Sequence, residues 1–277
     1  MHRGVLALSF LLLAAAAAGA AAYDDFARGL NAVQRGESDT AIAAFSAAIA
    51  AGDLSPGLMP QAYRDRGIAY LQKGDCDPAL ADFAAGLKLK PADGDITRQH
   101  ARAAACIGKT DIALADLTAL IDAKFSSDIY QDRGMLRWRT GDFPGAASDF
   151  AAYIAARPWD AHGTLWLEMV RARAGQLQPD VAAHDARQYD DEKWPAPLLA
   201  LYAGKSTPEQ ALAAAAVARD AARVPVQQCE ADFYTGEWLL AKPDPEGGKA
   251  LIAKAHRECP QDTIEYEDAG IELARLR

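Results

Sequence analysis

The chain has 277 residues, with 29 Lys and Arg against 38 Asp and Glu and a formal net charge of −9. Such an acidic balance argues against a general nucleic-acid binder or a binder of anionic membranes. Hydrophobic residues make up 51% of the chain, and a large share of them is Ala, the best helix former. We therefore expect an all-α protein.

The N-terminus has the pattern of a secretory signal peptide. Arg3 precedes the apolar run Val5–Leu13, and the small residues Ala14–Ala22 fit an A-x-A cleavage site. We predict that residues 1–22 are removed, that Tyr23 becomes the mature N-terminus, and that the protein is periplasmic or secreted without stable membrane insertion. The alternative is an anchor formed by an uncleaved N-terminal helix, because this uncharged stretch approaches the roughly 17–25 residues of a spanning helix.

The rest of the chain contains internal repeats. Gly67 and Gly134 are each followed by Gly, Ala, Phe and Pro at offsets of 7, 12, 16 and 24 residues. Steps of 38, 34, 33 and 34 residues separate five successive copies of this frame. Of these five, the copies centred on Gly29, Ala101 and Glu168 have only parts of the frame, and a further partial copy is centred on Gly236.

This frame resembles the tetratricopeptide repeat (TPR), a helix–turn–helix unit of about 34 residues. In that family the glycine and alanine leave room where the two helices cross, and the aromatic residue fills the space between neighbouring repeats. The resemblance implies an all-α, right-handed superhelical solenoid of helix hairpins with a terminal capping helix.

The repeat pattern divides the chain into five segments. They are a signal peptide (1–22), an N-terminal TPR array of about five repeats with a degenerate fifth (23–193), an atypical helix pair (194–225), a C-terminal TPR (226–260) and a capping helix (261–277). In the atypical pair, Thr207 and Pro208 predict the N-cap and first residue of the second helix. We expect Glu265, Glu267 and Asp268 on the solvent face of the capping helix.

Two segments, Trp194–Leu198 and Cys229–Glu237, also resemble bacterial envelope TPR lipoproteins of the NlpI type, which are adaptors for proteases and peptidoglycan hydrolases. No cysteine follows the apolar start, so their lipid anchor is not expected. The resemblance implies an exported scaffold or adaptor for other envelope proteins. The alternatives are a self-assembling structural subunit and an accessory protein that binds small ligands or glycans. Exposed clustered aromatics would mark the ligand-binding alternative, but we expect most of the dispersed tryptophans to pack inside, namely Trp159, Trp166, Trp194 and Trp238.

The four cysteines, Cys76, Cys106, Cys229 and Cys259, allow three disulfide connectivities. The hairpin geometry that the TPR resemblance implies favours Cys76–Cys106 and Cys229–Cys259. An oxidising compartment would permit both bonds. The alternative is four buried reduced thiols, and a zinc site is less expected because no C-x-x-C pair occurs.

No motif points to catalysis, a cofactor or a metal site. The histidines show no close metal-ligand spacing. The stretch Gly204–Thr207 copies the end of a phosphate-binding P-loop, but the glycine required five residues earlier is replaced by Leu199. We interpret this stretch as a turn and a helix cap, and we expect neither an enzyme nor a cofactor.

TPR proteins usually bind partners on the concave surface that the first helices of successive repeats line. The repeat frame places ten candidate partner-binding residues there: Gln61, Arg64, Arg98, Arg102, Gln131, Met135, Trp138, Arg139, Met169 and Arg173. Arginine suits bidentate capture of carboxylates, and Trp138 has the character of a hot-spot anchor. We therefore predict a protein partner that offers an acidic or C-terminal peptide segment, with a homodimer as a further possibility. The alternative is that the arginines form ion pairs within the solenoid, with Asp65, Asp95 or Asp132.

Overall fold

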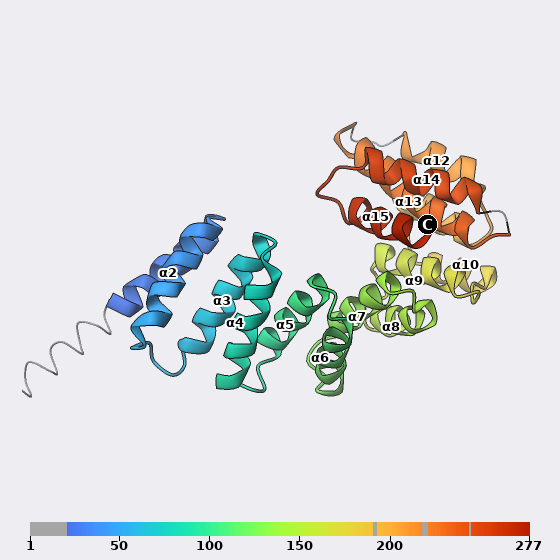
Figure 1. Ribbon diagram of the computed structural model, residues 1–277. Coiled ribbons are helices and arrows are strands. Elements are labelled where there is room, and N and C mark those ends of the chain that lie inside the picture. Colours follow the sequence, from blue (N-terminus) through green and yellow to red (C-terminus); the bar gives the residue numbers. More distant parts are fainter. Residues whose placement is uncertain (1–20, 191–192, 218–220, 244) are drawn as a thin grey trace, which may run out of the picture. The chain divides into compact units, whose positions relative to one another are not determined.

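The computed structural model describes residues 21–190, 193–217, 221–243 and 245–277 (Figure 1). These residues form helices and no strand, which confirms the predicted all-α class. None of the described helices has the length and apolarity that a membrane span requires. The predicted signal peptide lies, except for its last two residues, outside the described residues.

The chain divides into two compact units, Met1–Ser126 and Ser127–Arg277, called here the N-terminal and the C-terminal unit. The boundary between the units falls inside the predicted repeat array of residues 23–193. The repeat pattern defines that array, whereas contacts in space define the two units. Each unit is described by itself below.

The N-terminal unit consists of helix hairpins. It contains a helix over residues 21–34 followed by α2 (Ser38–Ala51), α3 (Met59–Gln72), α4 (Cys76–Leu89), α5 (Gly94–Cys106) and α6 (Thr110–Asp122). In the repeat frame α3 and α5 are first helices, and α4 and α6 are the second helices that pack against them.

The C-terminal unit begins with two regular hairpin helices and ends with a cap. Its helices are α7 (Asp128–Arg139), α8 (Phe143–Ala156), α9 (Ala161–Arg173), α10 (Pro179–Ala186), α11 (Ala196–Tyr202), α12 (Pro208–Ala215), the 3₁₀ turn η1 (Ala221–Arg223), α13 (Val224–Leu240), α14 (Glu246–Glu258) and α15 (Ile264–Arg275). Thr207 caps α12 and Pro208 is its first residue, as predicted, because the Thr207 hydroxyl and the Gln210 side chain form a reciprocal capping box.

A glycine on the first helix of a hairpin lies directly against a large side chain of the second helix. A Cβ added to Gly67 would lie 2.7 Å from the Phe83 ring, and one added to Gly134 would lie 3.0 Å from the Phe150 ring. Any larger residue would push the two helices apart. The same relation recurs at Gly29 with Phe45 and at Gly236 with Ile252.

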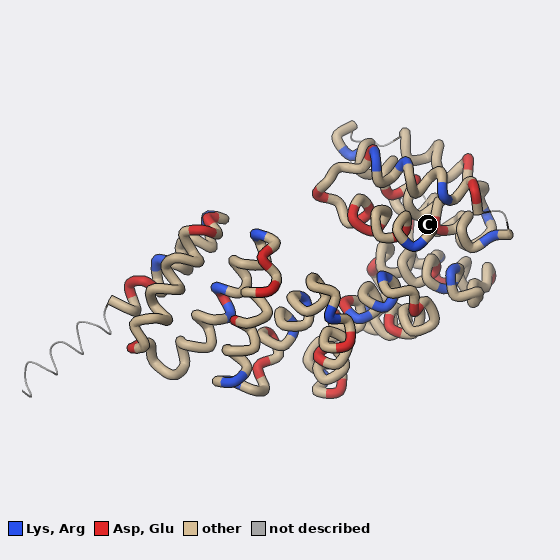
Figure 2. Tube along the Cα trace, in the orientation of Figure 1, with Lys and Arg blue, Asp and Glu red and all other residues tan. Residues whose placement is uncertain are grey.

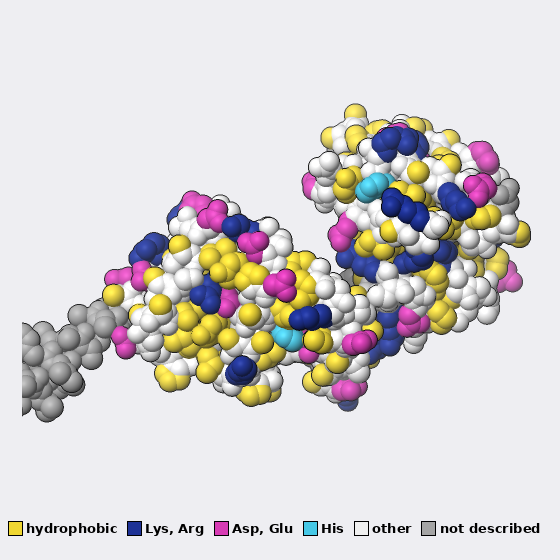
Figure 3. Space-filling model, in the orientation of Figure 1, with side chains coloured by type: hydrophobic (Ala, Val, Ile, Leu, Met, Phe, Trp, Pro, Cys, Tyr) yellow, Lys and Arg dark blue, Asp and Glu magenta, His cyan; other side chains and the backbone are white. Residues whose placement is uncertain are grey.

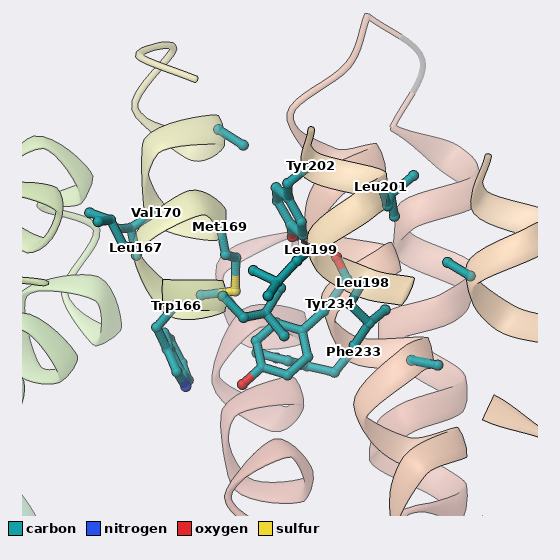
Figure 4. Packing of buried hydrophobic residues seen from close by; sticks show 14 of the residues in the cluster. Trp166, Leu167, Met169, Val170, Leu198, Leu199, Leu201, Tyr202, Phe233 and Tyr234 are labelled. Carbon is teal, nitrogen blue, oxygen red and sulfur yellow. Dashed lines mark hydrogen bonds between the residues drawn. The ribbon is translucent and has the colours of Figure 1, made fainter. Parts of the chain in front are cut away.

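The main core of the C-terminal unit joins the atypical helix pair to the repeats around it. Figure 4 shows side chains of α9, α11 and α13 interdigitating, among them Trp166, Met169, Tyr202 and Tyr234. The Tyr202 hydroxyl donates a hydrogen bond of 2.7 Å to the Tyr234 carbonyl oxygen, so this buried phenol is satisfied. Trp166 packs inside as expected, whereas Trp159 is 70% exposed in the turn between α8 and α9.

Each unit carries one disulfide, and both pairings are those predicted. Cys76 at the start of α4 bonds Cys106 at the end of α5, with the two Cα atoms 6.1 Å apart. Cys229 in α13 bonds Cys259, which directly follows α14, with the Cα atoms 5.0 Å apart. Each bond closes a sequence separation of 30 residues.

Candidate protein-binding site

The ten residues predicted to line one groove belong to two units. Gln61 and Arg64 lie on α3, and Arg98 and Arg102 lie on α5, in the N-terminal unit. The other six lie on α7 and α9 of the C-terminal unit: Gln131, Met135, Trp138, Arg139, Met169 and Arg173. The two sets have different surroundings.

In the N-terminal unit the four predicted residues form what we call the arginine face: Gln61, Arg64, Arg98 and Arg102. Gln61 and Arg102 are exposed, and Arg64 and Arg98 are half-buried. The Arg102 guanidinium donates to the Gln99 amide oxygen at 3.1 Å, and no carboxylate of the described residues pairs with it. Arg98 has interactions within the chain.

Arg64 connects α3 electrostatically to the beginning of α5. Its Nε lies 2.8 Å from Oδ1 of Asp65, which is one of the internal pairs that the alternative interpretation named. The carboxylates of Asp93 and Asp95 also act on it, which shows that the beginning of α5 adjoins α3. The guanidinium is held in place while part of it stays accessible.

Apolar side chains accompany these cations. Ile68 and Leu71 of α3 are half-buried and pack against a small core that contains Ile96 and Ala103 of α5. Figure 3 shows apolar side chains gathered over α3, α4 and α5 on the side drawn, with basic side chains among them. The arginine face therefore borders apolar surface that a partner could cover.

A second set of basic residues is used inside the hairpins. Arg66 forms a bidentate pair with Asp82 at 2.8 and 2.7 Å, and Arg133 forms the same pair with Asp149 at 2.9 and 2.7 Å. In the degenerate repeat His100 takes the same place, 2.6 Å from Asp116. Sequence reasoning missed these pairs, although the constant offset of 16 residues between partners was a visible signal.

In the C-terminal unit the prediction of a surface position is wrong for two residues. Trp138 and Met169 are both 0% exposed. The Trp138 ring lies 5.4 Å from the Trp166 ring and 6.0 Å from the Phe233 ring, so α13 covers this part of the first-helix surface. Trp138 is a core residue and cannot anchor a partner. Gln131 and Met135 are half-buried, and Met135 packs against the same core.

The two arginines predicted for this surface are bound by the chain's own carboxylates. Arg139 contacts Asp268 at 2.9 Å and Glu267 at 3.0 Å. Arg173 contacts Glu272 at 2.8 Å and also pairs with Glu237. The internal ion pairs of the alternative interpretation therefore occur here, but with residues of α13 and α15 and not with the aspartates it named. Figure 2 colours basic and acidic residues along the trace, and Figure 3 shows basic side chains gathered near α9 and α15.

Hydrogen bonds from a side chain of α15 to the backbone of α7 also hold these two helices together. The Arg275 guanidinium donates to the carbonyl oxygens of Trp138 at 2.8 Å and of Arg139 at 3.0 Å. The expectation that Glu265 and Asp268 lie on a solvent face is wrong, because they are 6% and 0% exposed. Only Glu267 is exposed. The acidic face of α15 is the face that packs inward.

Burial makes these carboxyl groups weaker acids than carboxyl groups in water. It raises the pKa of Asp268 to about 7 despite the ion pair with Arg139, and the pKa of Glu265 to about 7. Burial also raises the pKa of Glu237, which shares the Arg173 guanidinium with Glu272. Among the described residues, no donor reaches Oε1 of Glu237 or Oδ2 of Asp268. Protons can therefore remain on this cluster near neutral pH.

Groups of His, Cys, Asp and Glu that could hold a metal ion do not occur within the described ranges. His162 lies 3.6 Å from the carboxylate of Glu230, and its interaction with this carboxylate is the main cause that raises its pKa. Glu230 also accepts a hydrogen bond from the Trp194 indole. These contacts join α9, the start of α11 and α13 as a structural polar cluster.

Comparison with known proteins finds similarity at the level of structure. A tetratricopeptide repeat protein from Parabacteroides merdae is 16% identical over 91% of this chain and 98% of its own, with a TM-score of 0.62. The MamA protein is 17% identical over 60% of this chain and 88% of its own, with a TM-score of 0.53. The C-terminal part of a TPR repeat-containing protein from Cytophaga hutchinsonii is 14% identical over 90% of this chain and 87% of its own, with a TM-score of 0.53.

No protein-family model matches the sequence, and no curated protein matches it either. The repeat frame, the helix hairpins with a glycine at their crossing, and the three structural likenesses agree. The chain has the tetratricopeptide-repeat fold.

Proposed function

We propose that this protein is an exported scaffold that binds an acidic segment of a partner protein on the arginine face of its N-terminal unit. The observation that carries the proposal is the occupied counterpart in the C-terminal unit. There, arginines of the first helices α7 and α9 take carboxylates of an acidic helix, α15. The arginine face offers the same side chains on first helices, and the exposed Arg102 has no carboxylate partner within the described part of the chain.

The chemistry of the arginine face fits such a ligand. A guanidinium forms two parallel hydrogen bonds to a carboxylate, each worth about 1.5–3 kcal/mol when the group is charged and shielded from water. Ile68 and Leu71 add partly exposed apolar area next to these cations. Since exposed ion pairs alone contribute little, we expect the partner segment to combine carboxylates with apolar side chains.

In-cell crosslinking of the full chain tests this proposal. The variant Arg64→Gln/Arg102→Glu should lose the crosslinked partner, because it removes one cation and reverses another on the arginine face. A matched control is Arg257→Glu, which changes an exposed arginine of the C-terminal unit that pairs with the neighbouring Glu258. Loss of the same band in both variants, or in neither, would argue against the arginine face as the binding site.

Export is part of the proposal and rests on the signal-peptide pattern of residues 1–22 and on the two disulfides, which persist in oxidising compartments. Cell fractionation followed by N-terminal sequencing tests it. The expected result is a soluble exported chain that starts at Tyr23. A chain that keeps its first residues and sediments with membranes would instead support the uncleaved anchor.

We further propose that the partner is another envelope protein and that the scaffold itself catalyses no reaction. Mass spectrometry of the crosslinked band identifies the partner. A band that contains only this chain at twice its mass would favour the self-assembling subunit instead.

A further inference from the structure

A hollow of about 130 Å³ lies between the short helices α10 and α11 of the C-terminal unit. It holds several times the roughly 30 Å³ that one water occupies in the liquid. The lining residues are Ala183, Ala186, Arg187, Ala196, Leu199, Ala200, Ala203 and Lys205.

Two cations stand at the rim of this apolar floor. Arg187 and Lys205 are exposed, and no carboxylate of the described residues pairs with either of them. Their neighbours behave differently, since Arg171 pairs with Glu168 and Lys193 with Asp190. The two rim charges are available to a ligand.

The turn that carries Lys205 is fixed by the backbone. Gly204 ends α11 with a φ of +68°, a conformation that favours glycine, and the Lys205 N–H donates to the Ala200 carbonyl oxygen at 2.9 Å. This is the stretch with the appearance of a P-loop end. The structure makes it a helix end and a cap, as predicted, and places its lysine at the hollow.

A second, more open hollow of about 440 Å³ adjoins the first and shares Arg187 with it. Its other lining residues are polar: His184, Asp185 and Gln188. The Asp185 carboxylate lies 3.3 Å from Arg171, which partly balances its charge. A ligand longer than one residue could therefore continue along α10 over hydrogen-bonding groups.

We propose that the hollow between α10 and α11 binds the carboxyl-terminal residue of a partner polypeptide. A small apolar last side chain lies on the alanine floor, its carboxylate lies between Arg187 and Lys205, and the preceding residues cross the second hollow. Recognition of a chain terminus through its carboxylate is a recurring mode of peptide binding. This site is separate from the arginine face and does not depend on it.

The chemistry selects a chain terminus over other carboxylates. An internal Asp or Glu side chain would bring only one or two methylene groups to the alanine floor. A small free acid would cover the floor but leave the second hollow empty, and so little burial does not offset the entropy lost on binding. An apolar C-terminal residue with a peptide before it uses the floor, the rim and the second hollow together.

Methyl NMR on the full chain with ¹³C-labelled alanine methyl groups tests this inference, because the floor is largely alanine. The probe is the hexapeptide Gly-Ser-Gly-Ser-Ala-Val, used once as the free acid and once as the C-terminal amide. We expect saturable shifts of the Ala183, Ala186, Ala196, Ala200 and Ala203 methyl signals with the acid, and about tenfold weaker binding of the amide, a difference of about 1.4 kcal/mol. Equal binding of both peptides, or no shift of these signals at millimolar peptide, would overturn the inference.

Variants of the exposed rim separate binding from folding. Arg187→Gln/Lys205→Gln should abolish the preference for the acid, while Arg223→Gln, another exposed arginine of this unit, should keep it. Circular dichroism melting confirms that each variant is folded. Arg102→Glu should leave this binding unchanged, so failure of the hollow and failure of the arginine face are distinguishable. A double rim variant that still prefers the acid would refute the role of the two cations.

Discussion

Both units carry arginines on their first helices, at different positions of the repeat frame, and use them differently. In the C-terminal unit Arg139 and Arg173 are 29% and 10% exposed, and their carboxylate partners Asp268 and Glu272 are fully buried. In the N-terminal unit Arg102 is exposed and donates a hydrogen bond to the Gln99 amide oxygen. A similar first-helix surface is thus closed in one unit and open in the other.

One segment of the chain already occupies a first-helix surface as a bound ligand would. The helix α15 is acidic on the face that meets α7, and it combines carboxylates with the apolar Ala269. Such a helix is the chemical model for a segment that would cover the arginine face.

The largest expected effect comes from removing the shared cation of the closed surface. Arg173→Met leaves Glu237 and Glu272 buried without the guanidinium that lies between them. We expect a loss of roughly 3–5 kcal/mol in the free energy of unfolding at pH 8. Urea titration followed by tryptophan fluorescence measures it, because Trp138, Trp159, Trp166, Trp194 and Trp238 all belong to the C-terminal unit. The exposed control Arg257→Met should change stability by less than about 1 kcal/mol, and similar losses in both variants would contradict the account.

Removing each disulfide tests whether the two units also differ in how much a disulfide stabilises them. Both bonds close 30 residues of chain, so loop entropy predicts similar stabilisation, roughly 3–4 kcal/mol each. The variants Cys76→Ser/Cys106→Ser and Cys229→Ser/Cys259→Ser should each lose this amount in their own unit. Amide hydrogen exchange reports both units in one experiment. A loss in one unit that is several times the loss in the other would show that more than the closed surface separates them.

The pH dependence of stability should be concentrated in the C-terminal unit. Burial raises the pKa of Glu168, Glu265 and Asp268 to about 7, so the folded unit binds more protons than the unfolded chain between about pH 4 and 7. The free energy of unfolding therefore falls as pH rises through this window. We expect the melting temperature from tryptophan fluorescence to drop by several degrees from pH 5 to pH 8. Glu265→Gln should flatten this slope, and a melting temperature that rises with pH would contradict it.

The smallest effect on stability is expected at the open surface. Arg102→Glu changes an exposed side chain without a carboxylate partner among the described residues, so the free energy of unfolding should change by less than about 0.5 kcal/mol. Affinity for an acidic partner should fall about tenfold or more, which is about 1.4 kcal/mol. Titration calorimetry with the crosslinked partner measures the affinity, and Arg102→Gln should lie between the wild type and Arg102→Glu.

Much of the fold follows from local sequence signals. The glycine, alanine and aromatic offsets mark where helices cross, and those contacts occur within one hairpin of the chain, as Gly67 and Phe83 show. The disulfide pairs followed from the same hairpin geometry. Thr207 and Pro208 marked a helix start because caps are local.

The closed surface could not be predicted in the same way. Arg139 and Asp268 are 129 residues apart, and their contact depends on how α13 and α15 pack back onto α7 and α9. Acidic residues were assigned to solvent because burying a charge is costly unless it is paired. One signal was present: Glu265, Asp268 and Glu272 recur at helical spacing and form a single stripe. When one helix carries a stripe of acidic residues and other helices carry arginines, the stripe can be a face that forms buried ion pairs within the chain.

Site-specific photocrosslinking of the full chain in cells tests whether the arginine face is open while the first-helix surface of the C-terminal unit is occupied. A photoreactive residue replaces Gln61 on α3 in one variant and Met135 on α7, which packs against the core of the C-terminal unit, in the other. We expect a crosslinked partner protein from position 61 and no intermolecular product from position 135. A partner captured from position 135 and none from position 61 would contradict this expectation.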